Sequence, residues 1–233
     1  KTIKQFLAKN AVNGIITDNR PSVFSPNFPS VYITHQRNVQ AGIFSGLATA
    51  AHKMLYKKFT QIWVPDVETE PKISGILGGK TTDKNVKLIG LLSDLHKTNE
   101  EKMFDVAVIL SGPEPQRSLL ENALVAQLKN TNLKIMLLRG TTLPAAIQLP
   151  KKWFCVDLAS RAEVQTAFNN SKTIIARCGY STLMDLYQFP KPAILIPTPG
   201  QPEQEYLATL PLHKSTFEIQ TQQKLDVVAG LAH

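Results

Sequence analysis

The sequence predicts an α/β fold built on doubly wound parallel sheets. Short apolar runs alternate with stretches of helical periodicity along most of the chain, and this alternation is typical of parallel sheets with helical crossovers. Runs such as 105–110 and 193–197 are almost wholly apolar, as in strands buried on both faces. Ligands of such sheets bind outside the carboxyl ends of the strands. The loops that follow the strands are therefore the segments most informative about function.

Four strands are expected in the first half of the chain, at residues 14–18, 30–34, 61–65 and 86–90. Between the second and the third, apolar residues recur at helical spacing, which predicts a helix over 41–59. A polar stretch at 93–102 follows the fourth strand and is the best candidate for a domain boundary. We therefore expect a first domain over residues 1–92 and a second over 93–233.

The second half of the chain is more regular than the first. We expect strands at 105–110, 134–138, 153–156, 173–176 and 193–197, and helices at about 115–129, 161–169 and 181–187. A further helix containing Tyr206 and Leu207 follows the last strand. Because strands and helices alternate, the expected unit is the βαβ crossover, in which the strands run parallel.

The composition of the chain limits which classes of partner are expected. The chain of 233 residues has a formal net charge of +8, with 43% hydrophobic and 19% charged residues, which indicates a globular protein that favours anionic partners. No window is densely basic with interleaved aromatic residues, so a nucleic-acid partner is not expected. Cys155 and Cys178 belong to no CxxC pair or Cys/His cluster, so no metal site is expected. Two cysteines suit a reducing, cytoplasmic compartment.

The first informative loop follows the strand at 105–110 and runs from Ser111 to Arg117. Gly112 permits a tight turn after the strand, and the prolines fit the first turn of a helix. The start of that helix offers N–H groups to an anion, and Arg117 can add a charge-assisted contact. For this loop taken alone, a plain Gly/Pro turn with a surface arginine is the better account, because the GxGxxG pattern is absent.

The second loop starts at Arg177 and enters the helix at 181–187. Gly179 allows backbone to approach a ligand closely, and Ser181 and Thr182 place hydroxyls at a helix start, where phosphates bind. Asp185 lies three residues beyond Thr182 on the same face, where a carboxylate can accept hydrogen bonds from ribose hydroxyls. A helix cap with a solvated aspartate is the alternative reading of the same pattern.

Two more polar clusters follow strands. After the strand at 193–197, a Pro- and Gly-rich loop leads to Gln204 and Glu205, which can bind sugar hydroxyls or simply cap the next helix. In the first half, His35, Gln36 and Asn38 follow the strand at 30–34. His35 can act as a base, a donor or a ligand, although a lone histidine is more often a hydrogen-bonded structural residue.

Taken together, these loops resemble the GT-B glycosyltransferases of the MurG type, which carry the family 28 C-terminal domain. That family has an Arg-x-Gly-x-x-Thr-x-x-Glu signature, then a strand ending in Pro and a Gln-Gln pair. The matching residues here are Arg177, Gly179, Thr182, Asp185, Pro197, Gln204 and Glu205. A His-Glu-Gln-Asn segment before an apolar helix matches residues 35–38. The chain departs from the signature at Asp185, which replaces a glutamate, and at Glu205, which replaces a glutamine.

The resemblance implies two Rossmann-like domains facing a cleft, the first acceptor-side and the second donor-binding. It implies inverting, metal-independent transfer of a hexose or N-acetylhexosamine from a UDP-sugar to an acceptor hydroxyl, without a resident cofactor. The implied donor-binding residues are Ser111, Gly112, Arg117, Arg139, Arg177, Gly179, Ser181, Thr182, Asp185, Gln204 and Glu205. On the acceptor side the candidates are His35, Gln36 and Asn38, and the acceptor can be lipid-linked.

Two further expectations concern the start of the chain and contact with a membrane. The sequence opens on Lys1, in what reads as the middle of a helix, and the family's early Gly-rich loop with its proposed catalytic histidine would precede it. We therefore expect an N-terminally incomplete first domain. Lysines beside apolar residues in the helix expected at 41–59 suit peripheral contact with the inner face of a membrane, although a buried helix with a solvated end explains them too.

Two alternatives to a transferase stay open at the level of the sequence. A UDP-sugar hydrolase or 2-epimerase on the same scaffold would bind the nucleotide with similar loops. A nucleotide-sugar-binding module without catalysis would need no catalytic base. Release of free sugar without an acceptor distinguishes the hydrolase, and turnover by the full-length protein excludes the module.

Overall fold

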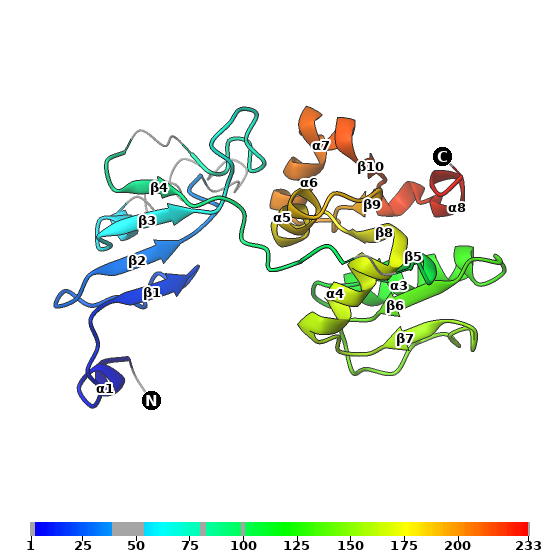
Figure 1. Ribbon diagram of the computed structural model, residues 1–233, viewed down its shortest axis with the longest axis horizontal. Helices are drawn as coiled ribbons and strands as arrows, with labels where there is room; N and C mark the ends of the chain where they lie inside the picture. The colour runs from blue at the N-terminus through cyan, green and yellow to red at the C-terminus, as the bar shows by residue number, and fades with distance from the viewer. Residues whose placement is uncertain (1–2, 39–53, 80–82, 99–100, 233) are drawn as a thin grey trace. The chain divides into compact units, whose positions relative to one another are not determined.

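The computed structural model describes residues 3–38, 54–79, 83–98 and 101–232. The chain divides into two compact units, Lys1–Leu92 and Ser93–His233, each built around its own parallel sheet (Figure 1). Among the described residues, no helix combines the length and the apolar character needed to span a membrane.

The first unit contains a four-stranded sheet in the order β1-β2-β3-β4. Its strands are β1 (Ile15–Asp18), β2 (Ser30–Ile33), β3 (Gln61–Val64) and β4 (Val86–Leu88), and a short helix α1 (Ile3–Leu7) precedes them. All three pairings are parallel. Aromatic side chains dominate the core of this unit: Tyr32, Tyr56 and Phe59 pack with Ile62 and Val64. The four strands predicted from the sequence are therefore present.

The connections of the first unit differ from the expected alternation of strand and helix. Residues 19–29 and 65–79 contain turns and irregular backbone but no helix. Both segments are rich in proline or glycine, which disfavour helix interiors, and this explains the difference. The helix expected over 41–59 falls mainly on residues outside the described part of the chain. Its described end is helical at 54–56.

The second unit contains a six-stranded sheet whose neighbouring strands all run parallel. Its strands are β5 (Phe104–Ile109), β6 (Ile135–Leu138), β7 (Phe154–Val156), β8 (Ser171–Arg177), β9 (Ala193–Ile196) and β10 (Glu218–Ile219). Their order is β10-β9-β8-β5-β6-β7. The chain therefore starts in the middle of the sheet, builds outward through β6 and β7, and then returns to build the other half. This is the order of the doubly wound dinucleotide-binding fold.

Residues 139–153, between β6 and β7, contain no helix, but helices follow β5, β7, β8 and β9 as the sequence predicts. They are α3 (Gln116–Leu128), α4 (Arg161–Asn170), α5 (Tyr180–Gln188) and α6 (Pro202–Thr209), followed by α7 (Pro211–Thr216), η2 (Gln222–Lys224) and α8 (Val227–Gly230). Alternate residues of β5 pack with α3 and α8 in one apolar core that includes Val106, Val108, Leu120 and Val227. Ala107, on the opposite face of β5, is also fully buried, so both faces of the sheet are covered.

Candidate functional site

The strand order reverses between β5 and β8, and this makes the carboxyl edge of the sheet at that point the expected ligand site. The chain leaves β5 toward one half of the sheet and leaves β8 toward the other, which opens a crevice between the two connections. The register places Ile109 opposite Ala176, and Arg177 opposite Ile196. The loops after β5, β8 and β9 therefore start side by side at the same level of the sheet.

The loop after β5 is exposed and ends at the start of α3. Residues 111–115 are all exposed, and Gly112 adopts φ +100°, a conformation that favours glycine. The N-cap of α3 is Pro115, which makes no side-chain cap bond, while Oε2 of Glu114 accepts from the N–H of Ser118 in the first turn at 3.2 Å. As predicted, the loop is a tight turn into a helix, and Ser111 and Gly112 lie at its exposed tip.

The loop after β8 is shorter. Gly179 is the N-cap of α5 and makes no side-chain cap bond. Ser181 is exposed and Thr182 half-buried in the first turn of the helix. An added methyl group at Gly179 would lie 3.9 Å from Nε2 of Gln204, which is an ordinary contact. Gly179 and Gln204, predicted from two separate loops, are thus neighbours.

Arg177 joins three of these loops. Its Nη2 donates to the carbonyl oxygen of Gln116 at the start of α3 (2.6 Å), and its Nη1 donates to the carbonyl oxygen of Pro197 after β9 (3.3 Å). The side chain is 1% exposed, and burial lowers its pKa to about 10. Its Nε is buried without a partner. No carboxylate of the described residues forms an ion pair with Arg177, so a buried positive charge stands at the reversal point.

The loop after β9 is held together by the side chains predicted to bind the sugar. Gln204 accepts from the backbone N–H of Thr198 at 2.9 Å and from its hydroxyl at 3.0 Å, and its Nε2 donates to Gln201 at 2.7 Å. Glu205 accepts from the N–H of Gly200 at 2.9 Å. Both side chains therefore fix the conformation of this loop.

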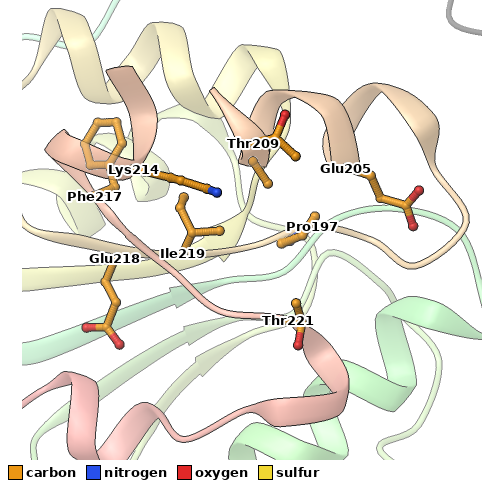
Figure 2. A pocket seen from close by; sticks show the side chains of 9 residues that line it. Pro197, Glu205, Thr209, Lys214, Phe217, Glu218, Ile219 and Thr221 are labelled. Atoms are coloured by element: carbon orange, nitrogen blue, oxygen red, sulfur yellow. The ribbon is translucent and has the colours of Figure 1, made fainter. Parts of the chain in front are cut away.

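A cavity of about 580 Å³ opens beside this loop. Its wall includes Pro197 and Glu205 from the β9–α6 segment, together with Lys214, Phe217 and Ile219. In Figure 2 the ammonium group of Lys214 reaches into the cavity, whereas the carboxylate of Glu205 is directed away from its middle. The volume lies in the range of small-molecule sites, and the walls are mostly apolar with a single basic group pointing inward.

Asp185 is half-buried, and both of its oxygens have partners. Its Oδ1 accepts from the hydroxyl of Ser93 at 2.6 Å and from Nη2 of Arg161 at 3.0 Å, and its Oδ2 accepts from Nη1 of Arg161 at 3.1 Å. The side chain is 14% exposed. The alternative reading of Asp185 as a solvated aspartate is therefore excluded, and its partners, Ser93 and Arg161, come from two segments that were not predicted to take part in the site.

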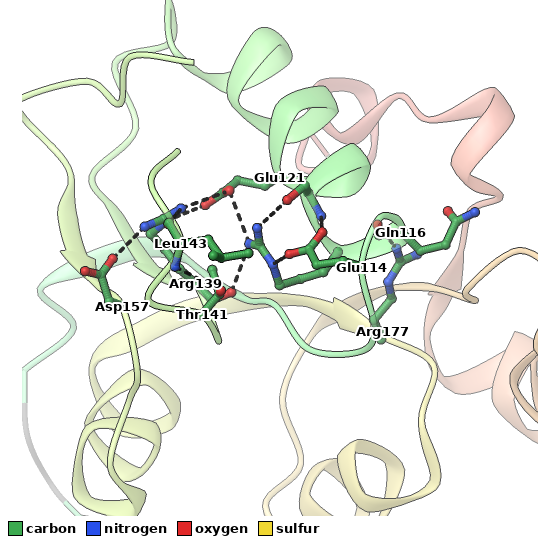
Figure 3. Close-up of polar contacts among 10 residues, drawn as sticks. Glu114, Gln116, Glu121, Arg139, Thr141, Leu143, Asp157 and Arg177 are labelled. Atoms are coloured by element: carbon green, nitrogen blue, oxygen red, sulfur yellow. Dashed lines mark hydrogen bonds and ion pairs between the residues drawn. The ribbon is translucent and has the colours of Figure 1, made fainter. Parts of the chain in front are cut away.

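Arg117 and Arg139, both expected to bind the donor, instead occupy a buried ionic network (Figure 3). Arg117 is 2% exposed and Arg139 4%. Glu121, itself 1% exposed, accepts from Nε of Arg139 at 2.5 Å and from Nη1 of Arg117 at 3.2 Å. Glu114 and Asp157 complete the network at 2.6 Å each. The physical reason is helical periodicity, which turns Arg117 and Glu121 toward the core together with Leu120 and Leu124.

The network still shapes the carboxyl edge of the sheet. Nη1 of Arg117 donates to the carbonyl oxygen of Arg139, and Nη2 of Arg139 donates to that of Leu143 at 2.9 Å. Glu114 belongs to the loop after β5 and Asp157 directly follows β7. Through these contacts, Glu121 ties together the loops that follow β5, β6 and β7.

In the first unit, the predicted acceptor residues follow β2 and meet the loop after β3. The backbone N–H groups of Arg37 and Asn38 both donate to the carbonyl oxygen of Leu77, at 2.8 and 2.9 Å. Nδ2 of Asn38 donates to the carbonyl oxygen of Ile76 at 2.7 Å. His35 and Gln36 are half-buried beside them. The structure thus brings 35–38 against the glycine-containing segment 74–79.

Several residues at these sites escaped the sequence analysis. Asp66 is 1% exposed and accepts from the N–H groups of Val67, Ile73 and Ser74, which folds the loop that receives residues 37–38. The available signal for this loop was an aspartate at its start and a Gly-Gly pair at its end, at residues 66–79. Ser93 and Arg161 carried no comparable signal, since their roles depend on tertiary contact with Asp185. Within the described ranges, His, Cys, Asp and Glu form no group of three that could hold a metal ion.

These features define a doubly wound α/β domain with its candidate site at the reversal of strand order. The chain belongs to glycosyltransferase family 28: the model of the family's C-terminal domain matches residues 108–225, about half of the chain. This match begins within β5, ends after β10 and includes the loops of the second unit described above. The protein is accordingly a glycosyltransferase with a GT-B fold. No match appears among curated protein sequences.

Solved structures resemble the chain in fold. The glycosyltransferase of kitacinnamycin is 10% identical with a TM-score of 0.64, and the match covers 99% of this chain and 68% of that one. MurG of Acinetobacter baumannii is 15% identical with a TM-score of 0.53, over 88% of this chain and 58% of that one. S. aureus MnaA, solved with UDP, is 10% identical with a TM-score of 0.51, over 91% and 69%. At these identities the likeness is one of fold.

Proposed function

We propose that the protein transfers a sugar from a UDP-sugar to an acceptor hydroxyl, with inversion and without a metal ion. The observation that carries this proposal is the reversal of strand order between β5 and β8, because α3 and α5 both begin there in a chain of glycosyltransferase family 28. The fold likeness to S. aureus MnaA, solved with UDP, supports uridine diphosphate as the nucleotide.

The diphosphate is assigned to the starts of α3 and α5. The N-cap residues, Pro115 and Gly179, make no side-chain cap bond, and helix N-termini attract anions through their N–H groups and the helix dipole. Gly179 presents no side chain, so the backbone is open to close approach by a phosphate. The buried charge of Arg177 stands behind the same edge and stabilises an anion there, since a buried charge is weakly screened.

Two sets of side chains are assigned to the remainder of the donor. Asp185 is placed in the first turns of α5 and would accept hydrogen bonds from the ribose. Gln204 and Glu205 shape the loop after β9, and we assign to this loop the hydroxyl groups of the transferred sugar. The glutamate at position 205 offers only hydrogen-bond acceptors, whereas a glutamine offers both donors and acceptors. The transferred sugar should therefore direct a hydroxyl hydrogen toward Glu205.

The reaction proposed is a single displacement at the anomeric carbon. The acceptor oxygen forms a bond to that carbon while its bond to the UDP oxygen breaks, and the acceptor proton passes to a base. Negative charge develops on the leaving diphosphate, so donors and helix dipoles placed there in advance lower the barrier. His35, Gln36 and Asn38 of the first unit are assigned to the acceptor.

Calorimetric titration with UDP, UMP, ADP and dTDP tests the donor assignment. We expect UDP to bind most tightly, and Asp185→Asn to weaken UDP by roughly tenfold or more, since it alters hydrogen bonds to a charged group. Asp105→Asn is the matched control, because Asp105 pairs with Lys172 at the opposite edge of the sheet. Equal affinity for ADP and UDP would contradict the assignment.

Turnover tests the reaction itself. We expect the full-length protein to consume a UDP-sugar only when an acceptor is present, and to do so equally well with a chelator. Formation of free sugar without an acceptor would instead establish a hydrolase, and binding of UDP without any turnover would establish a binding module.

A further inference from the structure

The first residues of the second unit lie along one stripe of helix α4. Residues 161, 165 and 169 are spaced four apart and therefore share a face of the helix. Gln165 accepts from the N–H of His96 at 2.9 Å, and Asn169 accepts from the N–H of Thr98 at 2.8 Å. Arg161 pairs with Asp94. This stripe holds residues 93–98, the segment that begins immediately after the first unit ends at Leu92.

The same segment reaches the carboxylate of Asp185. The Ser93 hydroxyl donates to Oδ1 of Asp185 at 2.6 Å, while Arg161 binds both oxygens at 3.0 and 3.1 Å. A carboxylate offers about four lone-pair positions, and three of them are used by these two partners. The fourth, on Oδ2, is the single position left for a further donor.

A ribose that presents its 2′- and 3′-hydroxyls to Asp185 needs two positions, so one present partner must leave. Arg161 makes a bidentate, charge-assisted contact, which is the stronger kind. Ser93 contributes one neutral donor. The Ser93 hydroxyl also accepts from the N–H of Leu95 at 3.3 Å, so its departure loosens the start of the segment.

We propose that Ser93 occupies the place of one ribose hydroxyl on Asp185, and that Arg161 is a positioning residue that orients this carboxylate. Binding of a ribonucleotide displaces Ser93 and releases residues 93–95 from α5. Because coupling between two sites is reciprocal, the attachment of this segment in turn weakens nucleotide binding. This inference rests on the proposed donor site, and it adds a regulation of that site by the segment at the unit boundary.

The test compares Ser93→Ala with the wild-type protein by calorimetry. Removal of the competing hydroxyl should tighten UDP binding by roughly three- to tenfold, the scale of one net hydrogen bond. For 2′-deoxyuridine diphosphate, which needs only the position already open, the tightening should be much smaller. Ser215→Ala is the matched control, because the hydroxyl of Ser215 donates within α7 to the carbonyl oxygen of Leu212, and it should leave both affinities unchanged.

Hydrogen exchange distinguishes this competition from a purely structural role of Ser93, because only the competition makes exchange depend on UDP. Saturation of the wild-type protein with UDP should accelerate exchange at the Leu95 amide, and Ser93→Ala should show that faster exchange without ligand. Arg161→Gln should weaken UDP binding, and Arg161→Lys should restore part of it.

The outcomes separate this inference from the donor assignment. If UDP binds but Ser93→Ala changes neither its affinity nor the UDP-dependence of exchange, the competition does not exist and the donor site stands. If neither the wild-type protein nor Ser93→Ala binds UDP at millimolar concentration, both proposals fall.

Discussion

At the scale of single residues, Glu121 is the buried carboxylate that lies between the guanidinium groups of Arg117 and Arg139. It is 1% exposed and bonds to both Arg117 and Arg139. The partners Glu114 and Asp157 lie at the rim, with side chains 38% and 60% exposed. Loss of a buried partner leaves charges without compensation, whereas loss of an exposed partner is moderated by water.

We therefore expect Glu121→Gln to lower the free energy of unfolding by about 3–5 kcal/mol. Glu114→Gln, which removes a partly exposed partner of the same arginine, should cost much less, because water moderates the loss. Urea unfolding followed by circular dichroism measures both. Equal costs for the two variants would show that the network is not organised around Glu121.

Lys191 gives the stability a defined pH dependence. Its side chain is 9% exposed, and burial, assisted by the nearby charge of Lys102, lowers its pKa from 10.5 to about 7. Between pH 7 and 10.5 the unfolded chain therefore binds more protons at this site than the folded chain. Stability should rise with pH through that window, by up to about 1.4 kcal/mol per pH unit.

Lys191→Met should remove this rise and stabilise the protein most at pH 7 and below, where the native state must otherwise carry a buried charge. Lys129→Met replaces an exposed lysine and should leave the profile unchanged. Thermal unfolding across pH 6–10 measures both variants; a wild-type profile that falls over this range would contradict the assignment to Lys191.

At the scale of elements, continuous apolar runs were sufficient to predict β5, β6, β8 and β9, because strands buried on both faces must be apolar throughout. The last elements of the chain could not be predicted in this way. β10 comprises two residues, Glu218 and Ile219, and exists because it pairs with β9. In the first unit, the prolines of 19–29 disfavour a helix, and the general alternation of strand and helix expected along the chain does not hold there.

The start of α5 is the element most sensitive to the proposed ligand. Gly179 has φ −87°, which any residue can adopt, and an added methyl group would make only an ordinary contact at 3.9 Å. Gly179→Ala should therefore change stability by less than about 1 kcal/mol. If a phosphate approaches this backbone closely, the same methyl group should weaken UDP binding by roughly tenfold.

Gly14→Ala is the matched control, because a methyl group there meets only the carbonyl of Pro29 at 3.4 Å in the first unit. It should alter neither stability nor UDP affinity appreciably. Unchanged UDP affinity in Gly179→Ala, measured by calorimetry alongside this control, would remove the diphosphate from the start of α5.

At the scale of the whole molecule, the site could be predicted only in part. The sequence indicated which loops carry polar residues, but the order of strands in the sheet decides which loops are neighbours. Arg177 shows what is gained from the structure: its guanidinium joins Gln116 and Pro197, from loops far apart in the chain. Arg117 shows how the structure removes a predicted contact: this arginine was expected at the surface, but its position on α3 turns it inward.

Net charge is the remaining property of the whole molecule, and it predicts how affinity responds to salt. The chain carries 26 Lys and Arg residues against 18 Asp and Glu residues, so its summed potential attracts an anionic nucleotide from a distance. Salt screens such long-range attraction, since the Debye length falls from about 30 Å at 0.01 M to about 3 Å at 1 M. Contacts with ribose and base hardly depend on screening.

We therefore expect the affinity for UDP to fall several-fold between about 0.02 M and 0.5 M sodium chloride, while the weaker affinity for uridine, which lacks the diphosphate, stays nearly constant. Titrations of both ligands at matched salt concentrations make the comparison. A parallel loss for uridine would mean that salt acts on the fold or on the nucleoside contacts. If the affinity for UDP does not change with salt, the diphosphate is held by short-range contacts alone, and the basic surface serves another partner.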